Sequence, residues 1–337
     1  GTSSGTIDPQ GVVVDPSTGY SYHAGTFEGT AVFGSHVLVS PLDSGSNVYV
    51  AAMNSGGVWQ WAASGGGENN EHVRGIGLDS SGYLYVAGYY YDNTTFGAID
   101  LDGDDSSNAF VAKIAPSNRV WQWAASTSGT SGNNAQGFAV DSSGNSYIIG
   151  GFSGTTSFGD ISLTTNGQSD IYVAKLTSGG TWSWANNAGS SLPDTGYGVA
   201  VDEATGSVYV TGSFMDDADF GSTTLTSDGG TDIFFAKLSN SGTWAWAKQA
   251  GSTSSDYGHD VVVDNATGKP IFTGYYSGTA TFGANSYSGG SYTTFVVKMS
   301  PSGGWDWVTT SSGAAAGESI TLGAAGSVFI TGKLSGT

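Results

Sequence analysis

The tryptophans of this chain fall in five Trp-x-Trp pairs that recur at steps of 62, 61, 62 and 61 residues. Because all ten tryptophans follow this regular spacing, the chain is expected to be an array of one repeated unit. Internal repeats of a few tens of residues are typical of solenoids, propellers and strings of small domains. Because such an array is one quasi-linear object, the length of 337 residues does not predict two separate domains. The pairs are Trp59/Trp61, Trp121/Trp123, Trp182/Trp184, Trp244/Trp246 and Trp305/Trp307.

Four apolar segments recur in each repeat, rich in Val, Ile, Tyr, Phe and Trp and separated by turns of Gly, Ser, Asn and Asp. In the second repeat they end at Asp79, Gly88, Lys113 and Trp123, with a Phe-Gly pair at Phe96. Such segments read as strands, and no stretch shows a sustained helical period, so almost no helix is expected. The pattern predicts an all-β fold: a β-propeller of four-stranded antiparallel blades, about 62 residues each. Because familiar blades have roughly 40–50 residues, we expect the excess in the second-to-third hairpin around Phe-Gly and in the loops between blades.

The predicted domain organisation is a Gly/Ser-rich lead-in over residues 1–9 followed by the propeller over residues 10–337. The last repeat stops after its second strand, and the lead-in is too short to supply the missing strands. Ring closure is therefore not encoded, and we expect the chain to be part of a larger chain or assembly. The predicted repeats are 10–73, 74–135, 136–196, 197–258, 259–317 and the partial repeat 318–337.

One segment shows a family resemblance. Residues 198–212 read GVAVDEATGSVYVTG, and residues 232–238 and 242–246 continue with DIFFAKL and GTWAW. This pattern resembles the SBBP-type repeat, a seven-bladed β-propeller-like family, from about residue 10 onward. The resemblance implies a secreted or cell-surface protein, often beside adhesion modules, and no shared catalytic residues. The first repeat departs from the pattern with Ala52 where later repeats carry Lys, and the fifth has Val297 in place of Ala, so we expect neither position to be obligatory for binding.

The charge is sparse and acidic, with 9 Lys and Arg against 28 Asp and Glu, a net charge of −19. An acidic surface repels phosphate backbones and anionic headgroups, which argues against nucleic acid and membrane-surface partners. Since there is no cysteine, disulfides, thiolate catalysis and cysteine metal sites are excluded. No run of eighteen apolar residues occurs, so no membrane insertion is predicted.

The Trp-x-Trp spacing predicts that both indoles lie on one face of a strand, because strand side chains alternate. We expect them to pack between blades; the alternative is an exposed aromatic platform for sugar rings. A lysine also recurs at one repeat position. We expect each to lay its stem across an aromatic ring and pair with the carboxylate that ends the first strand. These lysines are Lys113, Lys175, Lys237 and Lys298, and the carboxylates are Asp79, Asp141, Asp202 and Asp264.

One position at the start of each repeat is polar and different in every unit, while the apolar residues around it stay constant. In a propeller, the segment that enters the first strand of a blade lies near the central channel. A ring of dissimilar polar groups there is what a site for an asymmetric ligand would look like. The alternative is a set of exposed loop residues under no constraint. The residues are Gln10, Arg74, Gln136, Tyr197, His259 and Glu318.

An acidic cluster is the candidate metal site, because calcium takes several carboxylate and carbonyl oxygens from a sharply turned loop. Its glycine stands at the fourth position rather than the sixth, and its twelfth residue is Val111 rather than Glu. A solvated acidic turn is therefore favoured over a calcium site, and no other cofactor is predicted. The four histidines lack the paired spacing of a metal site. The candidate calcium ligands are Asp100, Asp102, Asp104 and Asp105.

These patterns predict a non-enzymatic, extracellular β-propeller module that forms a structural or adhesive part of a cell-surface or secreted assembly. The expected partners are other protein subunits or surface glycans. A carbohydrate-binding, lectin-like propeller is the main alternative. A polysaccharide hydrolase or lyase is less favoured, because it needs carboxylates clustered on one face, which the sequence gives no reason to expect.

Overall fold

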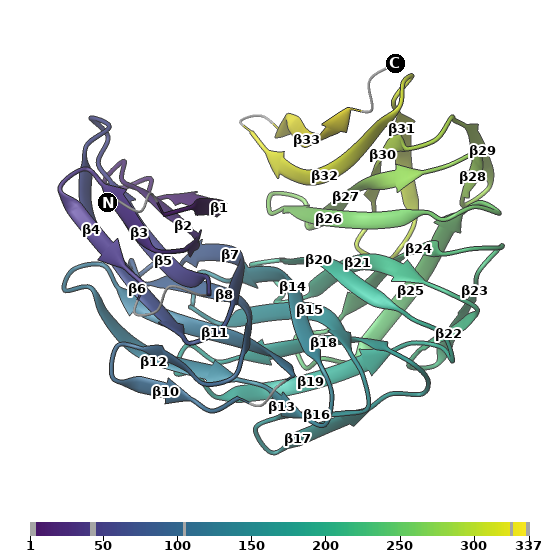
Figure 1. Ribbon diagram of the computed structural model, residues 1–337. Coiled ribbons are helices and arrows are strands. Elements are labelled where there is room, and N and C mark those ends of the chain that lie inside the picture. Colours follow the sequence, from purple (N-terminus) through teal and green to yellow (C-terminus); the bar gives the residue numbers. More distant parts are fainter. Residues whose placement is uncertain (1–4, 41–44, 104–105, 324–325, 335–337) are drawn as a thin grey trace. The chain divides into compact units, whose positions relative to one another are not determined.

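The computed structural model describes residues 5–40, 45–103, 106–323 and 326–334, which form antiparallel β-sheets of two to six strands without any α-helix (Figure 1). The predicted all-β fold is therefore confirmed. The chain divides into two compact units, and the division falls within the third repeat. Unit 1 holds residues 1–148, 155–162 and 175–183; unit 2 holds residues 149–154, 163–174 and 184–337.

Each of the five full repeats contributes a four-stranded sheet whose strands follow one another in chain order. The first strands begin two or three residues before the predicted repeat boundaries, so each boundary falls inside a strand. A two-stranded sheet, β32 (Ala315–Leu322) and β33 (Val328–Leu334), follows them. The four-stranded sheets are β1 (Ile7–Val14), β2 (Ser21–Phe27), β5 (Asn47–Met53), β6 (Trp59–Gly67); β7 (Glu71–Leu78), β8 (Leu84–Tyr91), β11 (Ser107–Ala115), β12 (Val120–Ser126); β14 (Asn133–Val140), β15 (Ser146–Phe152), β18 (Asp170–Leu176), β19 (Trp182–Ala188); β20 (Thr195–Val201), β21 (Val208–Phe214), β24 (Asp232–Leu238), β25 (Trp244–Gly251); and β26 (Tyr257–Asp264), β27 (Lys269–Tyr276), β30 (Thr293–Met299), β31 (Trp305–Thr310).

The expectation of four strands per repeat needs a correction, because each full repeat also contains a short hairpin between its second and third strands. The residues in excess of a familiar blade lie there, around the Phe-Gly pair, as the sequence predicts. Several hairpins extend the sheet of the preceding repeat: β9 pairs with β6, β28 with β25, and β16 with β13 (Ser128–Gly129). They thereby cover an edge that would otherwise expose unpaired backbone groups. The hairpins are β3 (Thr30–Phe33) with β4 (His36–Val39), β9 (Thr94–Phe96) with β10 (Ile99–Leu101), β16 (Thr155–Phe158) with β17 (Ile161–Thr164), β22 (Asp217–Phe220) with β23 (Thr223–Thr226), and β28 (Thr279–Phe282) with β29 (Asn285–Ser288).

The Phe-Gly pair closes each hairpin and anchors it to the sheet. In the second repeat Gly97 has φ 68°, a left-handed conformation that glycine adopts without strain. The preceding Phe96 is fully buried, and its ring centroid lies 4.9 Å from that of Trp121 in an edge-on arrangement. The same edge-on contact, at 5.0–5.2 Å, joins Phe to the first tryptophan in the first, third and fourth repeats.

The two indoles of a Trp-x-Trp pair do not share a face, which corrects the expectation from strand alternation. In the second repeat Trp123 lies opposite Lys113, and Trp121 lies opposite the next residue, Ile114. The middle residue, Gln122, is therefore the extra residue of a β-bulge, and the bulge turns the two indoles to opposite sides of the sheet. The register shifts at the same place in the first, fourth and fifth repeats.

Opposite orientation lets one pair contact both neighbouring sheets. The Trp121 indole N–H donates to the Ser64 carbonyl of the preceding repeat (3.2 Å), and the Trp123 indole donates to the Ser178 carbonyl of the following repeat (3.1 Å). In unit 2, Trp244 and Trp246 repeat this pattern. First strands of successive repeats also contact one another within each unit, β1 with β7 and β20 with β26. Within each unit, successive sheets therefore pack against each other through indoles and apolar strands.

The recurring lysine shows both predicted contacts, with an aromatic ring and with the carboxylate, in the second repeat, and the ion pair in the fifth. The Lys113 Nζ lies 4.2 Å from the ring centroid of Tyr83 and 3.9 Å from Oδ2 of Asp79. Lys298 forms an ion pair of 3.2 Å with Asp264. In the third and fourth repeats the lysine likewise lies over a tyrosine ring, Lys175 over Tyr147 and Lys237 over Tyr209.

Candidate functional site

The polar positions that the sequence singles out coincide with a second β-bulge, in the first strand of the repeat. The register shifts around Gln10, Arg74, Tyr197, His259 and Glu318, each of which is the unpaired extra residue. A bulge redirects a side chain away from the regular alternation of the strand, and bulges recur beside functional sites. The sequence places these positions in the segments that enter the first strands, with exposed loops as the alternative, whereas they lie within the strands.

In unit 1 the three predicted residues have different surroundings. The Gln10 amide donates to Asp8 (2.7 Å) and is exposed, and Gln136 is half-buried in β14. The Arg74 guanidinium carbon lies 5.4 Å from the ring centroid of Tyr89, on which His72 also stacks at 4.5 Å. Of Gln10, Arg74 and Gln136, only Arg74 therefore contacts a group of aromatic rings in the part of the chain that the structure describes.

In unit 2 the bulged residues lie in a larger group of rings, which we call the aromatic cluster: Tyr197, Tyr257, His259, Tyr275 and Tyr292. The His259 ring stacks on Tyr275 at 5.3 Å with 26° between the planes, and its centroid lies 5.4 Å from that of Tyr197. Tyr275 also contacts Tyr257 and Tyr292, both at 5.2 Å. Cross-strand pairing of Tyr257 with Tyr275 positions two of these rings. The cluster therefore depends on the register of β26 and β27.

A pocket of about 480 Å³ opens beside this cluster, lined by His259, Tyr275, Tyr292, Glu318 and Lys333 among others. Glu318 and Lys333 form an ion pair of 2.6 Å, while Nε2 of His259 has no hydrogen-bond partner among the described residues. Burial lowers the pKa of His259, so its ring is neutral at physiological pH. The pocket thus combines aromatic rings with an ion pair, and the unpaired His259 Nε2 is buried rather than open to the pocket.

The predicted site residues are only partly brought together. Tyr197 and His259 are in contact, and His259 and Glu318 line one pocket. Sequence reasoning missed Tyr257, Tyr275 and Tyr292. The sequence distinguishes these three tyrosines only weakly, because tyrosine is common in the strands. Two of them, Tyr257 and Tyr275, lie opposite each other in regular strands, and Tyr292 lies outside the strands.

Sequence reasoning also missed several carboxylates that are buried at the joints between repeats. Burial raises the pKa of Asp194 to about 6, of Asp232 to about 7 and of Glu71 to about 8. Each accepts backbone N–H groups of a nearby loop: Asp232, for example, accepts from the Asp228 N–H at 2.7 Å. Perturbed pKa values can mark catalytic groups, but the three side chains are at most 1% exposed, out of reach of a substrate. They act as anchors for the loops.

The candidate calcium ligands do not converge in the part that the structure describes. Asp100 lies in β10, and the Asp102 carbonyl accepts a hydrogen bond from the Tyr90 hydroxyl (2.8 Å). Asp104 and Asp105 lie outside the described residues. Across the described ranges, no group of three or more His, Asp or Glu side chains is arranged to hold a metal ion.

No protein-family model matches the chain, and no curated protein is significantly similar to it. The resemblance to the SBBP-type repeat therefore stays a prediction. Within the described residues, no helix is both long and apolar enough to cross a membrane.

Proposed function

We propose that this chain is a non-enzymatic binding module of an extracellular or cell-surface assembly, and that it binds saccharides at the aromatic cluster of unit 2. The observation that carries the proposal is the stack of Tyr197, His259 and Tyr275 beside an open pocket. Aromatic faces pack against the apolar faces of sugar rings, while a few polar groups fix the orientation of the hydroxyls. Glycan binding would be the means of an adhesive role.

The polar groups of the pocket suit hydroxyl recognition. His259 contributes its ring to the pocket lining, while its Nε2 is buried away from the pocket surface. Glu318 and Lys333 add an acceptor and a donor on the other side. Since Glu318 is the one carboxylate among the described lining residues and is paired with Lys333, the pocket lacks the two-carboxylate arrangement of a glycosidase. This supports binding without hydrolysis.

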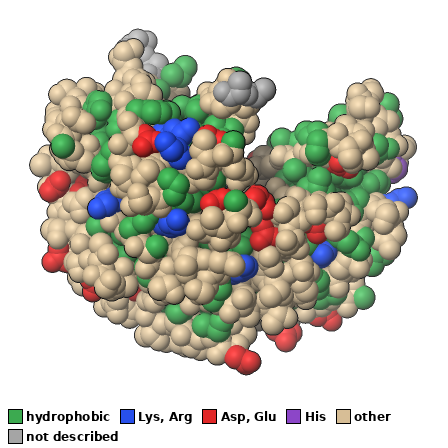
Figure 2. Space-filling view, turned by 180° about the vertical axis from the view of Figure 1, so that it is seen from behind, with side chains coloured by type: hydrophobic (Ala, Val, Ile, Leu, Met, Phe, Trp, Pro, Cys, Tyr) green, Lys and Arg blue, Asp and Glu red, His purple; other side chains and the backbone are tan. Residues whose placement is uncertain are grey.

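The surface supports an uncharged partner. Figure 2 shows charged side chains scattered among much larger areas of uncharged atoms on the face that it presents. Acidic residues outnumber basic ones, 28 against 9, which disfavours anionic partners. Neutral surface glycans or other protein subunits are the partners that fit.

We infer further that the repeats are blades of a β-propeller. Two observations support this: each repeat is a four-stranded antiparallel sheet, and first strands of successive repeats contact one another within each unit. Propeller blades pack face to face in this way. The location outside the cell and the SBBP-type family are parts of the same proposal and depend on the sequence resemblance.

A glycan array followed by titration calorimetry tests the saccharide proposal. We expect binding to a neutral glycan that Tyr275→Ala weakens at least tenfold, because truncation removes the central ring of the stack. His259→Gln is expected to weaken it less, since glutamine keeps a polar group. The matched control is Gln10→Ala, which changes the equivalent bulge residue of a repeat without an aromatic cluster. A blank array, or equal binding by Tyr275→Ala and wild type, would contradict saccharide binding here and leave the structural role.

A further inference from the structure

A second pocket lies in unit 1, between the first two repeats, and the other repeats show what normally fills its position. In the second repeat Lys113 stands opposite Tyr85 on one side and Trp123 on the other. Its Nζ lies 4.9 Å from the Tyr85 ring centroid, near Asp79, and donates to the Ser178 carbonyl at 3.3 Å. The fourth repeat has the same arrangement, with Lys237 donating to the Pro301 carbonyl. The space between successive sheets thus holds the ammonium group of one lysine, and we call this space the cradle.

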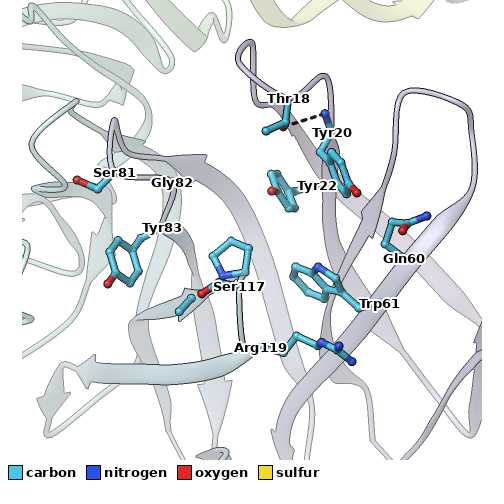
Figure 3. A pocket seen from close by; sticks show the side chains of 12 residues that line it. Thr18, Tyr20, Tyr22, Gln60, Trp61, Ser81, Gly82, Tyr83, Ser117 and Arg119 are labelled. Carbon is cyan, nitrogen blue, oxygen red and sulfur yellow. Dashed lines mark hydrogen bonds between the residues drawn. The ribbon is translucent and has the colours of Figure 1, made fainter.

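The first repeat keeps the cradle but lacks the lysine. Ala52 stands opposite Tyr22 and Trp61, as Lys113 stands opposite its own partners. By sequence position Tyr20 and Asp15 correspond to Tyr83 and Asp79. Tyr20 lines the pocket, whereas the Asp15 carboxylate lies outside the lining and accepts hydrogen bonds from Ser17 and Thr18. A pocket of about 640 Å³ is open here, lined by Tyr20, Tyr22 and Trp61, the last two of which pair with the buried Ala52 across the sheet. Figure 3 shows Tyr20, Tyr22 and Trp61 along one side of it and Tyr83 facing them.

A second substitution keeps this pocket wide. The turn of the next repeat carries Arg119, with φ 62°, where the third, fourth and fifth repeats carry glycine. At Gly242 an added Cβ would lie only 2.6 Å from the Trp184 ring, so a side chain at this turn cannot coexist with the usual close approach. Arg119 therefore separates the turn from Trp61, and Figure 3 shows its side chain extended alongside that indole at the rim.

The Asp15 carboxylate is charged and acts on the pocket from outside its lining. Hydrogen bonds from Ser17 and Thr18 lower the pKa of Asp15, so the carboxylate is ionised at neutral pH. Its charge also reaches the pocket wall, because burial and the charge of Asp15 raise the pKa of the Tyr22 hydroxyl. Among the described residues, no lysine or arginine forms an ion pair with Asp15, unlike Asp79 and Asp264.

We propose that this pocket binds a primary alkylammonium group, such as the lysine side chain of a partner protein, in the place that the chain's own lysine holds in the other repeats. Tyrosine and tryptophan rings attract an ammonium group through their faces. Asp15, outside the lining, adds a negative charge that acts on Tyr22, whereas Arg119 is the charged residue among the lining residues. The proposal concerns a different unit from the saccharide site and does not depend on it.

Titration calorimetry with Nα-acetyl-lysine-N-methylamide tests the proposal, with the neutral Nε-acetyl derivative as the matched ligand control. We expect binding of the charged ligand that weakens with added salt, and at least tenfold weaker binding of the neutral one. Butylammonium distinguishes the two possible sources of the ammonium group, a protein side chain and a free amine. Tighter binding of the lysine derivative indicates a protein side chain, and tighter binding of butylammonium indicates a free amine. Equal binding of the charged and neutral lysine derivatives, or no binding of either amine, overturns the proposal.

The decisive variant is Ala52→Lys, which restores the lysine of the other repeats. We expect this variant to bind the amine at least tenfold more weakly than the wild type. Its melting temperature is expected to equal or exceed that of the wild type, because four other repeats accommodate a lysine at this position. Asp15→Asn leaves the pocket open and is expected to weaken amine binding at least tenfold as well. Wild-type affinity in Asp15→Asn, or in a folded Ala52→Lys, contradicts the assignment.

Discussion

Replacing Asp232 by asparagine is expected to stabilise the protein progressively as the pH rises, by on the order of 3 to 4 kcal/mol more at pH 8 than at pH 4. Burial raises the pKa of Asp232 to about 7, the side chain is fully buried, and its Oδ1 has no hydrogen-bond partner among the described residues. The negative charge of Asp256 raises the pKa further, after burial. Ionisation of Asp232 therefore destabilises the folded state.

The sign of the pH dependence follows from proton binding. A carboxyl group whose pKa is raised on folding binds its proton more tightly in the folded state than in the unfolded state. Between the unfolded value near 4 and the folded value, the folded state holds more protons, so the free energy of unfolding falls as the pH rises. Asp194 and Glu71 act in the same direction, with folded pKa values of about 6 and about 8. We expect the wild type to lose stability steadily from pH 4 to pH 8.

Urea denaturation from pH 4 to pH 8 measures this effect. Asparagine fits the site, because Asn108 occupies the equivalent place in the second repeat and is buried there. The control is Asp160→Asn, which removes the same charge from an exposed turn and is expected to leave the slope of stability against pH unchanged. Parallel pH profiles for Asp232→Asn and the wild type would show that Asp232 is ionised without penalty.

Trp121→Ala is expected to lower the free energy of unfolding by about 3 to 5 kcal/mol, as truncation of a large buried side chain does. Trp121 is 8% exposed, packs edge-on against Phe96 and donates its indole N–H to the Ser64 carbonyl of the preceding sheet. Its loss leaves a cavity at the contact between two sheets. Trp121→Phe keeps a ring but removes the donor, and is expected to have a smaller effect.

The matched control for this prediction is Trp307→Ala, at the end of the same motif in the fifth repeat. That indole is 41% exposed, so its removal is expected to lower the free energy of unfolding by less than about 2 kcal/mol. Urea denaturation of the two variants at one pH gives the comparison. Equal losses would mean that packing between sheets does not depend on the buried indoles.

Much of the fold could be predicted from periodicity. The spacing of the tryptophans located the repeats, and the Gly/Ser/Asn/Asp turns located the four main strands, because turn residues and alternating apolar residues are local signals. The short hairpin around Phe96 and Gly97 was expected as extra length but not as two strands. Its pairing with the preceding sheet, β9 with β6, is a contact between repeats that local signals do not carry.

The bulges are the main reason why predicted side-chain directions failed. Strand alternation predicts one face for Trp121 and Trp123, but the bulge at Gln122 turns them apart. A bulge also lies at His259, and there it brings a position recognised from the sequence into contact with Tyr275, which was not recognised. One inserted residue in a strand leaves the composition unchanged while it reverses the faces of the residues that follow.

The amino-acid sequence by itself determined the repeat length, the all-β class, the positions of the indoles and the absence of cysteine chemistry, since these depend on residue identity and local order. Only the tertiary structure decided which repeats leave space between their sheets, which tyrosines gather around His259, and which carboxylates are buried. Those features arise from contacts between residues that are far apart in the sequence, such as Lys113 with Ser178, 65 positions apart, and Tyr197 with His259. Such contacts are set by the packing of one sheet on the next: where Ala52 and Arg119 stand in place of the lysine and glycine of other repeats, a pocket is open between the first two sheets.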